Sequence, residues 1–149
     1  LEEKGVTLIN SHADSAIIAE YAFGLSIALV NRIPEFDYNL RKGIWYDKAN
    51  MYWRSFFDMK VGLFGYGHIG KDIHKLLKQN NIDTYTIDRG HNYENINLVS
   101  SLEELVSKCD IIISCGLKIV SQVRLGVKVS GKTLQKGVIS IANTLLLYV

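Results

Sequence analysis

The residues that most clearly indicate a function form a short glycine-rich run in the middle of the chain, Gly65-Tyr66-Gly67-His68-Ile69-Gly70. An apolar segment, Val61 to Phe64, precedes this run, and a segment with helical periodicity follows it. Asp88 closes the next apolar segment, eighteen residues after the last glycine. A G-x-G-x-x-G turn between a strand and a helix, followed at this distance by a carboxylate, is typical of a dinucleotide-binding turn.

Each glycine has a separate physical role in such a turn. Gly65 permits the sharp exit from the strand, Gly67 lets a pyrophosphate reach the main chain, and Gly70 lets the helix pack closely on the sheet. The pyrophosphate is expected along the whole run, because the positive end of the helix attracts an anion there. Main-chain N–H groups near His68 and Ile69 are the expected donors.

Two residues at the end of the second predicted strand bear on the choice of cofactor. Asp88 can accept hydrogen bonds from both hydroxyls of the adenosine ribose, and its charge would repel a 2′-phosphate. This favours NAD over NADP. Arg89 has the opposite effect, because an arginine beside the carboxylate could pair with a 2′-phosphate or stack on adenine, so NADP stays an alternative.

The pattern does not point to metal or hydrolytic chemistry. His68 and His74 are six residues apart on a predicted helix, which places them on different faces. His12 and His91 fall in predicted loops without ligand partners at suitable spacing, and a solvated surface position is predicted for each histidine. No catalytic residue is assigned, and no G-x-S-x-G or paired-carboxylate pattern occurs.

The elements around the glycine run alternate between strand and helix. Strands are predicted at Val6 to Ile9, Val61 to Phe64, Ile82 to Ile87, Asp110 to Cys115 and Val138 to Ala142, and helices at Ser15 to Asn31, Lys71 to Gln79 and Leu102 to Lys108. This order predicts an α/β fold, a doubly wound parallel sheet with helices on both faces. Cys115, Gly116, Ala142 and Asn143 are expected on the nicotinamide side of the cofactor.

Local signals mark the ends of these helices. Asp14 or Ser15 is expected to cap the first helix, and Ser101 with a glutamate three residues later makes a capping box for the last. Asn80 and Asn81 are expected to end the middle helix in a left-handed conformation.

Composition limits the classes of protein. The 149 residues are enough for one domain, and a net charge of +2 with 48% hydrophobic residues argues against nucleic acid or an acidic membrane as partner. Cys109 and Cys115 lack metal-type spacing, so buried reduced thiols in a cytoplasmic protein are expected. The helix from Ser15 has apolar residues on almost every face, which indicates a covering partner domain or second subunit. Residues 43–59 are rich in aromatics, which indicates an interface, with a loop folded back on its own domain as the alternative.

The sequence resembles the D-isomer-specific 2-hydroxyacid dehydrogenases along nearly its whole length. Lys60 to Gly70 is similar to that family's G-K-x-x-G-I-x-G-x-G-x-I-G turn, although Met59 replaces its first glycine. The other similar segments are Ala16-Ile17-Ile18-Ala19-Glu20-Tyr21, Ala28-Leu29-Val30-Asn31-Arg32-Ile33-Pro34, Arg41-Lys42-Gly43-Ile44-Trp45, Ser101-Leu102-Glu103-Glu104-Leu105 and Cys109-Asp110-Ile111-Ile112.

The resemblance implies a division of the chain and a role for each part. Residues 1–15 would be a hinge region, 16–59 the interdomain helix and dimerisation arm of a homodimer, and 60–149 the βαβ core. The family passes hydride from a 2-hydroxy acid to NAD with a histidine base, a supporting glutamate and a carboxylate-binding arginine. The first two belong downstream of this chain, and Asn143 stands at the arginine position.

The expected function is therefore that of the NAD-binding domain of an oxidoreductase acting on the CH–OH group of a 2-hydroxy acid. The chain alone is expected to bind cofactor but to be inactive, and a small 2-hydroxy or 2-oxo acid would bind only if a substrate domain is supplied. Residues 116–136 and Leu145 to Val149 depart from the family pattern, as in a truncated reading of a longer gene. Alternatives are a non-catalytic NAD-binding regulatory or dimerisation module and a cofactor domain like that of adenosylhomocysteine hydrolase.

Overall fold

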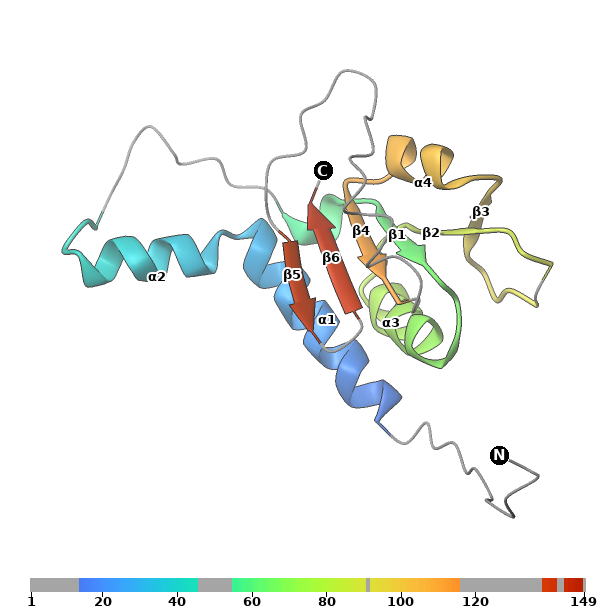
Figure 1. The fold of residues 1–149 in the computed structure, drawn as a ribbon, viewed down its shortest axis with the longest axis horizontal. Coiled ribbons are helices and arrows are strands. Elements are labelled where there is room, and N and C mark those ends of the chain that lie inside the picture. Colours follow the sequence, from blue (N-terminus) through green and yellow to red (C-terminus); the bar gives the residue numbers. More distant parts are fainter. Residues whose placement is uncertain (1–13, 46–54, 91, 116–137, 142–143, 149) are drawn as a thin grey trace, which may run out of the picture.

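The computed structural model describes residues 14–45, 55–90, 92–115, 138–141 and 144–148. Their strands form one sheet in the order β3-β2-β1-β4-β6-β5 (Figure 1). The strands are β1 Val61–Phe64, β2 Thr84–Ile87, β3 Asn97–Val99, β4 Ile111–Ser114, β5 Val138–Ile141 and β6 Thr144–Tyr148. The helices are α1 Ser15–Val30, α2 Ile33–Arg41, the 3-10 turn η3 Phe56–Asp58, α3 His68–Gln79 and α4 Leu102–Lys108.

The first four strands are parallel and carry helices on both faces, which confirms the predicted fold class. β1 pairs with β2 and β4, and β2 pairs with β3, all in parallel. Val61, Leu63, Ile111 and Ile113 alternate along two neighbouring strands and pack under α1 and α3. Ile112 points to the opposite face, where it meets Leu105 and Cys109 beside α4.

The last two strands differ from the prediction, because an antiparallel strand, β6, is inserted between β4 and β5. β6 pairs antiparallel with β4, and β5 lies outside it at the edge of the sheet, antiparallel to β6. The predicted strand from Val138 exists and runs in the same direction as β4, but β6 lies between the two, so its only described ladder is antiparallel. Residues 142–143 alone join β5 to β6, and a two-residue connection makes a hairpin, whereas a parallel crossover needs a dozen residues or more.

The end signals of the helices are only partly confirmed. Asn81 has φ 56°, the predicted left-handed stop. Asp14 stands at the N-cap of α1, but its side chain makes no capping bond. The Ser15 hydroxyl instead donates to Asp72 Oδ2 on α3 at 2.6 Å, because a carboxylate is a strong acceptor. This contact ties the start of α1 to α3.

Of the two hydrogen bonds of the predicted capping box of α4, only the one accepted by the serine side chain forms. Ser101 Oγ accepts a hydrogen bond from the Glu104 N–H at 3.2 Å, as predicted. The Glu104 carboxylate, however, reaches the N–H and hydroxyl of Ser100 at 2.8 and 2.7 Å. It also pairs with Lys108 Nζ at 2.7 Å, so that the acidic side chain links both ends of the helix.

α1 and α2 both expose apolar side chains. α1 buries Ala19, Ala22, Ser26 and Val30, one helical face, while Ile17 and Tyr21 are 56% and 62% exposed. α2 projects away from the sheet (Figure 1), after a bend at which Arg32 is left-handed. No single helix in the described part of the chain is long and apolar enough to cross a membrane, and α1 with α2 qualifies only as a pair bent by 60°.

Candidate cofactor-binding site

The glycine run leaves β1 at its carboxyl end and leads directly into α3. Gly65 has φ 107°, a conformation that L side chains rarely adopt, so glycine is required for the turn out of the strand. Gly67 is the N-cap of α3, and its carbonyl accepts the first helical hydrogen bond from Lys71 N–H at 2.9 Å. The N–H groups of the first turn therefore have no helical partner and face the end of the helix.

The lack of a side chain has a different effect at each of the other two glycines. A Cβ on Gly70 would lie 2.4 Å from the carbonyl oxygen of Gly65, so only glycine allows α3 to approach the strand so closely. A Cβ on Gly67 would meet nothing within 4 Å. The space beside Gly67 is open, as a site for a pyrophosphate requires.

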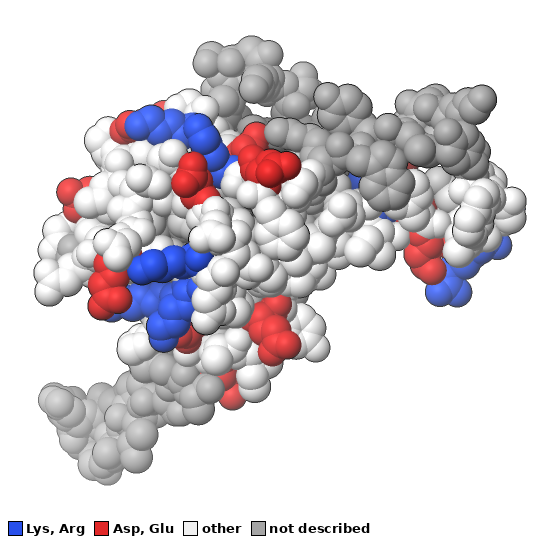
Figure 2. Space-filling view, turned by 180° about the vertical axis from the view of Figure 1, so that it is seen from behind, with Lys and Arg blue, Asp and Glu red and all other residues white. Residues whose placement is uncertain are grey.

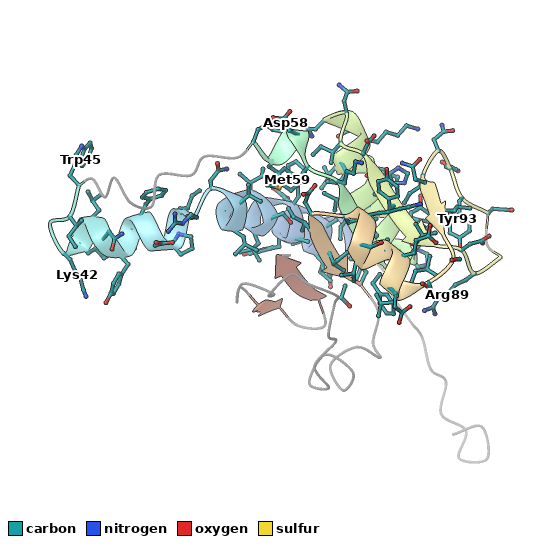
Figure 3. All side chains as sticks on the ribbon, turned by 90° about the horizontal axis from the view of Figure 1, so that it is seen from above. Lys42, Trp45, Asp58, Met59, Arg89 and Tyr93 are labelled. Atoms are coloured by element: carbon teal, nitrogen blue, oxygen red, sulfur yellow. The ribbon has the colours of Figure 1, made fainter. Side chains whose placement is uncertain are left out.

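A cleft of about 400 Å³ opens at this turn. It lies where β1 and β2 end, the edge at which doubly wound sheets bind their ligands. Its lining consists of Gly65, Tyr66, Gly67, Lys71, Ile87, Arg89, Asn92 and Tyr93. Two of these side chains are cationic and none is acidic, so the cleft suits an anionic ligand. Arg89 and Tyr93 lie at the opposite end of the molecule from Trp45 (Figure 3).

Asp88 stands at the predicted place, directly after β2, but it does not line the cleft. Its Oδ1 accepts a hydrogen bond from the Gly90 N–H at 2.9 Å, and its own N–H donates to the Val99 carbonyl at 2.8 Å. Arg89 lines the cleft in its place, with its guanidinium 5.5 Å from the centre of the Phe64 ring. A contact between Asp88 and the ribose stays a prediction.

A chain of aromatic contacts crosses the site, and the sequence did not reveal it. Tyr66 in the glycine turn shares a 2.6 Å hydrogen bond between its hydroxyl and His74 Nδ1. Its ring lies 5.4 Å from the ring of Tyr93, between centroids. The Tyr93 hydroxyl accepts from the Arg89 N–H at 2.7 Å and donates to the Ile87 carbonyl at 3.2 Å.

The predicted surface position of His74 is wrong, because the side chain is 5% exposed. Burial lowers the pKa of His74 and raises that of Tyr66. Helical spacing could have identified the burial, since His74 stands four residues after Gly70 and three before Leu77, both of which are buried. His68, by contrast, is exposed at the first position of α3, as predicted.

Charged side chains of both signs are interspersed over the face shown in Figure 2. A second hollow, of about 330 Å³, adjoins the cleft and shares Tyr66, Lys71 and Asn92 with it. Lys75 in this hollow pairs with Asp72 at 3.1 Å. The Ser15 hydroxyl and Lys75 lower the pKa of Asp72, so the carboxylate stays charged beside the lysine.

The comparison with known families decides the assignment. Residues 23–118, more than half of the chain, match the family "D-isomer specific 2-hydroxyacid dehydrogenase, NAD binding domain". The chain belongs to this family. The glycine turn, the cleft and the parallel strands therefore form the NAD-binding domain of a 2-hydroxyacid dehydrogenase family member.

Individual relatives agree with this assignment. D-3-phosphoglycerate dehydrogenase from Haemophilus influenzae is 28% identical over 112 residues, which cover 73% of this chain and 27% of the relative. A D-lactate dehydrogenase from Treponema pallidum is 27% identical with a TM-score of 0.60, covering 68% of this chain and 31% of the other. D-lactate dehydrogenase with NAD+ from Lactobacillus jensenii, at 23% identity and a TM-score of 0.64, covers 74% and 34% and shows the shared fold. The chain thus spans about a third or less of each.

Of the residues predicted on the nicotinamide side of this NAD-binding domain, the structure describes Cys115. Its N–H donates to the Phe64 carbonyl at 2.9 Å, and its sulfur lies 4.0 Å from the Cβ position of Gly70. Burial raises the pKa of this thiol to about 12, so it is protonated at neutral pH. Gly116, Ala142 and Asn143 lie outside the described residues, as do His12, His91 and the strand predicted at Val6 to Ile9.

Proposed function

We propose that the chain binds NAD in the cleft at Gly65 to Gly70, as the cofactor domain of an oxidoreductase acting on a 2-hydroxy acid. The observation that carries this proposal is the set of three glycine geometries. Gly65 needs its positive φ, Gly70 has no room for a Cβ, and Gly67 faces open space. A pyrophosphate can use this space, and the main-chain donors of the first turn of α3 can hold it.

The residues of the chain have distinct tasks in this proposal. The amides of the first turn of α3 hold the pyrophosphate, and Lys71 and Arg89 add positive charge to the cleft wall. Bound NAD would accept the hydride from the hydroxyl carbon of the substrate. The described cleft lining has no histidine or carboxylate to take the hydroxyl proton. We therefore assign that base, and the binding of a 2-hydroxy or 2-oxo acid, to a substrate domain supplied with this one.

The test is a titration of the purified chain with NAD and with NADP, read by calorimetry and by the shift in melting temperature. We expect NAD to bind and to raise the melting temperature. Gly67→Ala should fold normally, because its Cβ meets nothing, but should bind NAD at least about tenfold more weakly, because the methyl group occupies the space of the pyrophosphate. Gly24→Ala, in the open on α1, is the matched control. If neither cofactor binds the unaltered chain, the proposal is wrong.

We propose further that α2 and the residues after it form the contact of a homodimer. Ile33, Phe36, Leu40, Ile44 and Trp45 are 37% to 84% exposed, and several line a hollow of about 600 Å³. An amphipathic helix that exposes its apolar face away from the sheet favours a covering partner, and an identical helix offers a self-complementary one. Light scattering should give a dimer mass, and Leu40→Glu should give a monomer. Leu98→Glu, 43% exposed at β3, should stay dimeric.

The alternative is a non-catalytic regulatory module, in which the binding of NAD changes dimerisation. Asn143 at the position of the family's arginine favours it, since an amide lacks the charge that grips a carboxylate. Hydride transfer measured on the chain mixed with a substrate domain of the family separates the two readings. Activity under these conditions supports the oxidoreductase, and NAD binding without activity supports the module.

A further inference from the structure

Tyr93 occupies an unusual place in the segment after β2. Its hydroxyl makes two main-chain hydrogen bonds, one from the Arg89 N–H at 2.7 Å and one to the Ile87 carbonyl at 3.2 Å. These two groups come from the end of β2 and from the segment that follows it. The single phenol therefore holds together the turn that begins at Asp88.

The ring of Tyr93 has a second task. It lies 5.4 Å from the ring of Tyr66, and both rings line the cleft. Tyr66 is itself fixed from the other side, by the 2.6 Å hydrogen bond between its hydroxyl and His74 on α3. The two tyrosines thus form a continuous aromatic wall from the helix to the end of β2.

We infer that Tyr93 is the positioning residue for the adenosine end of the cleft. This inference rests on the proposed NAD site and deepens it. The pyrophosphate depends on the glycine turn, whereas the nucleoside beyond it must lie against Ile87, Arg89 and Tyr93. The main chain of Arg89 determines where its side chain would lie relative to the ribose. The Tyr93 hydroxyl fixes that main chain through its hydrogen bond to the Arg89 N–H. The two rings are tilted by 48° to each other, and the face of either one can stack on a purine.

The test compares three probes, NAD, AMP and inorganic pyrophosphate, on the full chain and on Tyr93→Phe. The variant keeps the ring and loses both hydrogen bonds of the hydroxyl. We expect AMP and NAD to bind about fivefold more weakly, the order of one net hydrogen bond, and pyrophosphate to bind as before. Tyr21→Phe, which removes an exposed phenol on α1, is the matched control and should change none of the three.

The remaining outcomes are equally decisive. Equal AMP affinity in Tyr93→Phe and the unaltered chain would overturn the inference while leaving the NAD site intact. An equal loss for pyrophosphate and AMP would also overturn it, since the hydroxyl would then support the whole fold of the site. If Tyr93→Phe unfolds, the same three titrations are made with Tyr93→His, which keeps a ring and a polar group. Weaker AMP binding with unchanged pyrophosphate binding would support the inference, and AMP affinity equal to that of the unaltered chain would overturn it. Absence of NAD binding to the unaltered chain would instead refute the proposed function itself.

Discussion

Replacing Gly70 with alanine tests how closely α3 approaches β1. The new Cβ would lie 2.4 Å from the Gly65 oxygen and 3.2 Å from the Gly65 carbonyl carbon. Both atoms belong to the main chain of the glycine turn, so no flexible side chain can move aside. The helix and the turn must therefore separate by about 1 Å to restore ordinary contact.

The size of the effect follows from two opposing terms. Forcing a methyl group into a closely packed site costs roughly 1–3 kcal/mol. Alanine in place of glycine within a helix returns about 0.5–1 kcal/mol. We expect Gly70→Ala to lower the free energy of unfolding by about 1–2 kcal/mol. Gly24→Ala, in α1 with nothing near its Cβ, should raise it by about 0.5–1 kcal/mol.

Urea unfolding followed by circular dichroism measures both variants, and an NAD titration of the folded Gly70→Ala chain measures the turn. We expect a lower midpoint, and weaker NAD binding because the donors of the first turn are displaced. If Gly70→Ala gained stability as Gly24→Ala does, the close approach of the helix would be refuted. If it lost stability but bound NAD normally, the turn would have no part in holding the cofactor.

Three further predictions concern groups outside the cleft. Ser101→Ala should cost about 1 kcal/mol of stability in urea unfolding, because Ser101 Oγ caps α4. Burial raises the pKa of Cys109 and of Cys115 to about 12, from 9.0, so both should react slowly with a disulfide reagent at pH 8 until the chain unfolds. The thiols ionise at a lower pH in the unfolded chain than in the folded one, so the free energy of unfolding should fall as the pH rises from 9 toward 12. A free energy of unfolding that stayed constant over this pH range would contradict the prediction. The pKa of Glu104 is lowered to about 2, from 4.5, by its hydrogen bonds to Lys108 and Ser100. Its stabilising effect should be complete above pH 4.5 and disappear as the pH falls toward 2, and Glu104→Gln should remove that part of the acid sensitivity.

The parallel core could be predicted because its signals are local. Apolar runs such as Ile111 to Ser114 specify strands, and the G-x-G-x-x-G pattern specifies the turn in which Gly65 needs a positive φ and Gly70 has no room for a Cβ. The antiparallel hairpin of β5 and β6 could not be predicted in the same way. Strand order depends on the connections and on pairing partners, and the apolar pattern of Val138 to Ile141 does not specify which strand becomes its neighbour.

The site was predictable in its main chain more than in its side chains. Spacing placed Asp88 after β2 correctly, but the Gly90 N–H competes for its carboxylate, a contact made by local turn geometry. Tyr93 lies in a segment without periodicity, and its hydrogen bonds join groups that only the folded chain brings together. Helical spacing could have identified the burial of His74 but not its hydrogen bond to Tyr66, because Tyr66 comes from the preceding turn.

The contact between Ser15 and Asp72 has a mechanical implication. α1 lies along α3, and α3 begins at the amides that face the cleft. Ile17 and Tyr21 are exposed on α1, where a neighbouring chain or domain could contact them. Only α1 and α3 would then lie between that contact and the amides at the cleft, and its effect would not have to pass through the sheet. A displacement of these two packed helices would thus couple assembly at one surface to nucleotide binding at the other.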